Sequence, residues 1–207
     1  MIASVSPPEA GRGTAWVLWS VVSVIGGVLG ALVAWRVRNL LMVPAPVILT
    51  DLLRYLATIL SATITAGAQW LLLRRYRLDV YWWVPATLTA SVIAVLLVIP
   101  RVLRVTLPAG SSFNPTGTAI AGGLAVAAAG LLIGTAQALV LRTSSGNIAW
   151  AWVPVTVVGG GLAGALTSAL SSQLFGMPPF VSLSLLAALG ALLISVCQAP
   201  VLYRLVG

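Results

Sequence analysis

The sequence contains no histidine and no lysine, and it has one cysteine and three acidic residues among 207 positions. Without histidine, neither a Ser–His nor a Cys–His nucleophile can be assembled, and histidine-ligated haem is excluded. The single Cys197 allows no disulfide within one chain and no cysteine-based metal site. The acidic residues Glu9, Asp51 and Asp79 do not form a pair inside an apolar stretch. We therefore expect no catalytic residues, no metal and no cofactor, and a protein that is not an enzyme.

Charge of either sign is scarce, and apolar residues are abundant. Only 7% of the residues are charged and 60% are hydrophobic, with a mean hydropathy of +1.09. A soluble domain has about 25% charged residues, so this chain cannot cover a water-facing globule with polar surface. The net charge of +8 would suggest nucleic acid in a soluble protein. Here the arginines lie between apolar runs, which indicates lipid headgroups as their partners and no nucleic acid.

Six apolar runs follow a polar tail at residues 1–14. They lie at about 15–35, 48–73, 82–100, 118–141, 149–172 and 181–203. Each is close to the ~20 residues that cross a hydrocarbon core, and lipid requires backbone groups to be paired within a helix. We expect an all-α, polytopic membrane helix bundle with six transmembrane helices in a single membrane domain at 15–207. The expected location is a bacterial inner membrane, with both termini on the cytoplasmic side.

The six runs are expected to be three tandem two-helix repeats, at about 15–77, 80–143 and 148–204. Each first helix opens with tryptophans, and small residues follow seven positions after Trp19, Trp83 and Trp152. Each second helix is preceded by proline and ends in a related decapeptide: GAQWLLLRRY, TAQALVLRTS or VCQAPVLYRL. Recurrence of several features in one order is hard to obtain by chance.

Each decapeptide contains a glutamine at the same place: Gln69, Gln137 and Gln198. Positions three, seven and eleven residues before each glutamine share one helix face. Eight of these nine positions hold small residues, and Val126 is the exception. Small faces are where membrane helices approach closely, so the amides should lie on a packed face. These glutamines are the candidate intramembrane polar cluster.

Three interpretations of the glutamines remain open. In the structural one, each amide fixes its helix to a neighbour, once per repeat. In the functional one, the three units pack around a pseudo-threefold axis and the amides line one cavity near the end that holds both termini, called side A. In the third, the amides face unrelated partners. The opposite end of the bundle is called side B.

The remaining candidate residues are interfacial anchors. Arg74 and Arg142 follow their glutamines by five residues, and Arg204 follows by six, so they can extend to headgroups on side A. Trp19, Trp83 and Trp152 stand near the same side, where aromatic residues gather at membrane interfaces.

The pattern Gln-x-x-x-Leu-Arg, a short turn and a Trp-rich helix start resembles a group of uncharacterised multi-pass bacterial membrane proteins with repeated Gln/Trp two-helix units. The stretches GAQWLLLRRYRLDVYWWVPAT and GTAQALVLRTSSGNIAWAWVPVT carry the resemblance. The third copy departs, because Tyr203 separates Leu202 from Arg204. The resemblance implies no established activity.

Packing surface is abundant in this sequence and chemistry is absent. The leading hypothesis is therefore a non-enzymatic scaffold or accessory subunit that packs against membrane proteins or lipids, or forms a homo-oligomer. The alternative hypothesis is a passive pore or facilitator for a small solute that uses a ring of the three glutamines.

Overall fold

The computed structural model describes residues 10–40, 47–76, 78–107, 114–174 and 176–206, and these are helical apart from short turns, with no strand among them. In chain order the elements are α1 (Ala10–Leu40), α2 (Val47–Arg75), α3 (Trp83–Ile93), the π-helical segment η1 (Ala94–Val98), α4 (Ile99–Thr106), α5 (Pro115–Ser145), the 3-10 segment η2 (Gly146–Ala151), α6 (Trp152–Ser171) and α7 (Pro179–Leu205).

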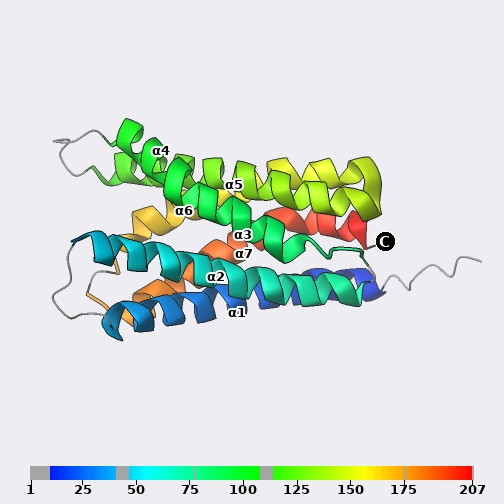
Figure 1. Cartoon of the computed structure of the whole chain (residues 1–207), viewed down its shortest axis with the longest axis horizontal. Helices are drawn as coiled ribbons and strands as arrows, with labels where there is room; N and C mark the ends of the chain where they lie inside the picture. The colour runs from blue at the N-terminus through cyan, green and yellow to red at the C-terminus, as the bar shows by residue number, and fades with distance from the viewer. Residues whose placement is uncertain (1–9, 41–46, 77, 108–113, 175, 207) are drawn as a thin grey trace, which may run out of the picture.

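The helices form a closed ring of neighbours. Each helix contacts the next in the order α1, α2, α3, α5, α6 and α7, and α7 returns to α1. The start of α1 and the end of α7 lie at one end of the molecule, on the right in Figure 1. That end is side A, and the helices run lengthwise from it to side B. The ring therefore encloses a common interior between neighbouring helices.

The membrane class predicted from composition is confirmed at the level of helix length and hydropathy. Among the described residues, four helical stretches are long and apolar enough to cross a membrane: Thr14–Val37, Trp83–Thr106, Pro115–Ser171 and Pro179–Leu205. The predicted count of six separate spans is not supported, and the run 48–73 is not among these four stretches. The runs 118–141 and 149–172 fall in one helical stretch, because η2 connects α5 to α6 without an open loop. Gly146 begins η2 with a φ of 58°, a left-handed value that favours glycine.

Two boundaries differ from the prediction for a physical reason. The run expected to end at residue 100 continues to Thr106, and its π-helical segment precedes Pro100. Proline has no N–H to donate and its ring crowds the preceding turn, so the helix widens locally and then continues. At the other end, α1 begins at Ala10, inside the predicted polar tail. Residues 1–9 of that tail lie outside the described residues.

Glycines permit the closest approaches between helices. A Cβ placed on Gly130 of α5 would lie 2.9 Å from the carbonyl oxygen of Thr156 on α6. A Cβ on Gly26 of α1 would lie 2.9 Å from the Cα of Thr65 on α2. Backbones this close leave no room for a methyl group, which is how membrane helices gain dispersion contact.

Candidate functional site

Three tryptophans meet in the interior of the ring. Trp19, Trp83 and Trp152 come from α1, α3 and α6, and each is 0% exposed. The ring centroids of Trp19 and Trp83 are 6.1 Å apart, those of Trp19 and Trp152 are 5.5 Å apart, and those of Trp83 and Trp152 are 6.1 Å apart. All three pairs are edge-to-face, with interplanar angles of 77°, 83° and 74°. Such pairs contribute about 0.5–1.5 kcal/mol each beyond their burial. We call this cluster the tryptophan triad.

Each of the three glutamines donates to a hydroxyl on an earlier helix: Gln69 from α2 to α1, Gln137 from α5 to α3, and Gln198 from α7 to α6. The side-chain nitrogen of Gln69 lies 3.0 Å from the Ser23 oxygen, that of Gln137 lies 3.1 Å from the Thr87 oxygen, and that of Gln198 lies 3.0 Å from the Thr156 oxygen. Each hydroxyl stands four residues after a triad tryptophan, which puts both on one helix face.

Two of the glutamines also accept a hydrogen bond from a tryptophan. The indole N–H of Trp19 donates to Gln198 at 3.0 Å, and that of Trp152 donates to Gln137 at 2.8 Å. These bonds join α1 to α7 and α6 to α5, so they close two seams between successive helix pairs. All four partners are at most 4% exposed, and a buried polar group without a partner is costly.

The third seam, between α2 and α3, has the same residues but lacks the bond. Trp83 donates to no acceptor although its indole nitrogen is buried, and Gln69 accepts no hydrogen bond from the described residues. The packing agrees with this difference, because α2 contacts α3 far less than α5 contacts α6 or α7 contacts α1. The ring therefore has two closed joints and one open joint.

A cavity of about 230 Å³ lies directly beneath the triad, and all three glutamines line it. Its walls also include Thr87, Ser91 and Thr156, and no charged residue lines it. The remaining lining residues precede the glutamines in their helices or follow Thr87 and Thr156 in theirs, so the cavity extends from the glutamines toward side B. A second cavity, of about 290 Å³, shares Thr65, Gln69 and Ile194 with the first.

The structural interpretation and part of the functional interpretation therefore apply to the same three glutamines. Each amide fixes its helix to a neighbour, and all three amides also line one cavity. The cavity does not open toward side A as the functional interpretation expects. The triad lies between the cavity and side A, because Trp83 and Trp152 are nearer to side A than Thr87 and Thr156 are.

The structure separates the two kinds of predicted anchor. Arg74, Arg142 and Arg204 are exposed in the last turns of α2, α5 and α7, and the guanidinium carbon of Arg74 lies 4.8 Å from the centroid of the Trp70 ring. The interfacial role predicted for Trp19, Trp83 and Trp152 is wrong, because a side chain that is 0% exposed cannot contact headgroups. The neighbouring Tyr81, Trp82 and Trp150 are exposed instead, at 72%, 64% and 40%.

The hydroxyl partners of the glutamines were missed by sequence reasoning, although a signal was present. Ser23, Thr87 and Thr156 occur at one fixed spacing after the triad tryptophans. Serine and threonine are common throughout this chain, so the spacing stands out only once those tryptophans are known to face inward.

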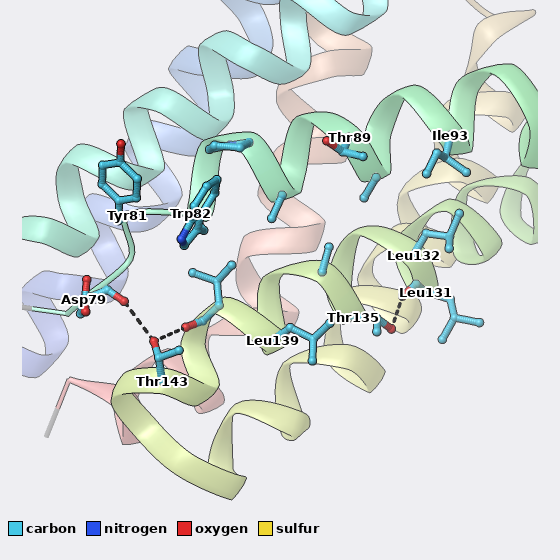
Figure 2. Close-up of a pocket in the computed structure, with 15 residues that line it drawn as sticks. Asp79, Tyr81, Trp82, Thr89, Ile93, Leu131, Leu132, Thr135, Leu139 and Thr143 are labelled. Carbon is cyan, nitrogen blue, oxygen red and sulfur yellow. Dashed lines mark hydrogen bonds between the residues drawn. The ribbon is translucent and has the colours of Figure 1, made fainter.

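A larger hollow of about 930 Å³ lies on the outside of the ring between α3 and α5, and we call it the outer groove. In Figure 2, Trp82 just before α3 and Thr89 and Ile93 from α3 face Leu131, Thr135 and Leu139 from α5. Small side chains line the groove between these larger ones: Ala86, Ala90 and Ala136. At its side A end, the hydroxyls of Thr143 and Ser144 donate to the carbonyl oxygen of Asp79 at 3.3 and 3.1 Å, which fixes the turn before α3 to the end of α5.

No protein-family model, curated protein or solved structure matches the chain in the comparisons made. The class is therefore defined by the described residues themselves: an all-helical protein with four helices long and apolar enough to cross a membrane.

Proposed function

We propose that this chain is a multi-pass membrane protein of six spanning helices in three tandem hairpins, and that it serves as a non-enzymatic accessory subunit. The hairpins would be α1 with α2, the α3–α4 stretch with α5, and α6 with α7. The support is the recurrence of one tryptophan, one hydroxyl and one glutamine in each pair, with the amide-to-hydroxyl bond between the same two positions. A bacterial inner membrane with cytoplasmic termini is part of this proposal.

The observation that carries the accessory role is the outer groove. Its volume of about 930 Å³ lies on a face that no other part of the described chain covers. Ala86 and Ala90 stand four residues apart on α3, and Ala136 faces them from α5. Small residues at this spacing let a further helix backbone approach closely, and the larger Leu131, Leu139 and Ile93 can pack around it. The occupant we propose is a transmembrane helix of a partner protein.

The test is purification of the full chain from its native membrane in mild detergent, with a photoreactive group at Leu139, which is 51% exposed in the groove wall. We expect a crosslink to an apolar helix of one partner that co-purifies in a fixed ratio. Ala136→Phe would fill the groove and should abolish both. Ala169→Phe, at an exposed alanine of α6, is the matched control and should preserve both. A lone monomer, a crosslink to lipid only, or a crosslink to a second copy of this chain would each contradict the proposed partner.

A passive pore is the second candidate function, because all three glutamines line one uncharged cavity. Solute passage would require the three tryptophans to separate, because they pack against one another between the glutamines and side A. Flux of small uncharged solutes into liposomes containing the protein tests this candidate. Flux that is unchanged in the triple Gln69→Leu, Gln137→Leu, Gln198→Leu variant would exclude it.

A further inference from the structure

The interior cavity has unused hydrogen-bonding capacity, because each of the three glutamines that line it donates only one of its two amide N–H groups to the described residues. Ser91 lines the cavity, is 5% exposed, and its hydroxyl makes no hydrogen bond to the described residues. Gln69 lines the same cavity and uses only one of its two amide N–H groups, toward Ser23. Trp83, directly above, has a buried indole N–H with no acceptor. All three residues belong to the seam between α2 and α3.

At the other two seams the glutamine oxygens are paired with Trp19 and Trp152, and one of the equivalent hydroxyls both accepts and donates. Thr156 accepts from Gln198 and donates to the carbonyl oxygen of Trp152 at 2.8 Å. The positions that match Ser91, eight residues after the triad tryptophans, are Gly27 and Gly160, which have no side-chain donor. Buried polar groups in proteins are nearly always paired with protein or with ordered water. The Ser91 hydroxyl and the unused N–H groups of the glutamines face one cavity, and a guest with an acceptor oxygen would pair them.

The chemistry of the lining defines that guest. Ser91 O–H and the free N–H of Gln69 are both donors, and a carbonyl oxygen has two lone pairs with which to accept from them. No acidic, basic or thiol group lines the cavity, so a charged guest would be desolvated without compensation. The apolar walls include Val126, Ile133 and Ile194. An apolar cavity of roughly 150 Å³ holds benzene, so about 230 Å³ suits a ring of somewhat greater size.

We infer that the cavity beneath the tryptophan triad is a binding site for an uncharged cyclic carbonyl compound, held by Ser91 and Gln69. The way in is the seam between α2 and α3. There the Trp–Gln bond is absent, α2 contacts the α3–α4 stretch less than any other neighbouring helices contact each other, and the π-helical segment before Pro100 follows α3. The inference is independent of the accessory role, because the outer groove and this cavity lie on opposite faces of α3.

The test uses the full chain in nanodiscs and two probes that differ only in the acceptor. Duroquinone has a tetramethylated ring with two carbonyl oxygens, and durene has the tetramethylated ring without them. The readout is the shift of the unfolding midpoint with probe concentration, because a ligand that binds only the folded state stabilises it by an amount that rises with the logarithm of its concentration above Kd. We expect duroquinone to bind at least about tenfold more tightly than durene, as the gain of two hydrogen bonds implies.

Two variants remove the proposed donors, and one variant serves as a control. Ser91→Ala and Gln69→Leu should each weaken duroquinone binding by about three- to tenfold, the usual effect of one lost hydrogen bond. Thr89→Ala, on the exposed face of α3, should leave binding unchanged. If Gln69→Leu prevents folding, the Ser91→Ala variant alone tests the proposal, because it removes one oxygen that makes no hydrogen bond to the described residues.

A further experiment distinguishes two kinds of guest: a lipid-soluble molecule with an alkyl tail that stays in the bilayer, and a compact molecule without a tail. A quinone with a decyl chain exceeds the cavity, so undiminished binding means that the chain passes out between α2 and α3 into lipid. Loss of binding with the decyl chain means that the site accepts only compact molecules. Either result supports a carbonyl site. Equal affinity for durene and duroquinone, no shift of the unfolding midpoint with either, or full affinity in both donor variants would overturn it.

Discussion

The indole N–H of Trp19 donates to the side-chain oxygen of Gln198 at 3.0 Å, across 179 positions of the sequence. This bond ties the first described helix to the last, and the same pair of residue types joins α6 to α5 through Trp152 and Gln137. The bonds lie beside a triad of edge-to-face rings in which no member is exposed. At these two seams polar side chains of the interior are therefore paired across helices, and the pairs close two of the three joints of the ring.

The three glutamines should differ in their contribution to stability, although they occupy equivalent places. Gln137→Leu removes two bonds and leaves the Trp152 N–H buried without an acceptor, which costs about 1–3 kcal/mol. Gln69→Leu removes one interhelical bond, which is worth about 0.6 kcal/mol in a membrane protein. Reversible unfolding in mixed micelles with increasing SDS measures both. Equal destabilisation by the two substitutions would contradict the difference between closed and open joints.

Close packing between α5 and α6 predicts a second contrast. Gly130→Ala places a methyl group 2.9 Å from the carbonyl oxygen of Thr156, and the backbones must separate to accept it. Overpacking of this kind costs about 1–3 kcal/mol. At Gly67 of α2 nothing lies within 4 Å of an added Cβ, so Gly67→Ala should be neutral or should stabilise by up to about 1 kcal/mol through helix propensity. The same unfolding measurement checks both, and a neutral Gly130→Ala would show that the two helices are not in contact.

Membrane topology gives a third prediction. Asn147 is exposed in the connection between α5 and α6, and Met177 is exposed before α7. The 20 residues of α6 lie between these positions, and at 1.5 Å per residue they span about 30 Å, the thickness of a hydrocarbon core. In a Cys197→Ser background, Asn147→Cys and Met177→Cys should react with a membrane-impermeant thiol reagent from opposite sides of sealed vesicles.

The control for that experiment is the same labelling after detergent has dissolved the vesicles, where both cysteines should react. Labelling of both positions from one side of intact vesicles would mean that α6 does not cross. The six-helix arrangement of three hairpins would then be untenable.

Sequence reasoning recovered the helical class and the apolar stretches, because lipid imposes a composition and a length that any reader of the chain can recognise. It also selected the three glutamines, since an amide in an apolar run is rare enough to be noticed. It misplaced Trp19, Trp83 and Trp152, because a tryptophan near a membrane surface usually contacts headgroups. Whether such a ring faces lipid or protein depends on helix rotation. Rotation was not predicted for these helices, whose small residues and apolar residues lie on every side.

The continuous helical connection at Gly146 and the π-helical segment before Pro100 were also not predicted. Both depend on how neighbouring helices fix the chain, and the residue types at these positions are equally compatible with an open loop and a simple helix end. The cavity was not predicted for the same reason. Ser91 faces the cavity only when α3 is rotated so that Trp83 lies in the triad.

The most direct test of the ring is a set of double-mutant cycles, with Trp→Phe and Gln→Leu at each of the three seams, measured as free energies of unfolding in mixed micelles. We predict a coupling energy of about 0.6–1.7 kcal/mol between Trp19 and Gln198 and between Trp152 and Gln137, as found for interhelical hydrogen bonds in membranes. We predict a coupling near zero between Trp83 and Gln69, where the bond is absent. Coupling of equal size at all three seams, or at none, would contradict the account.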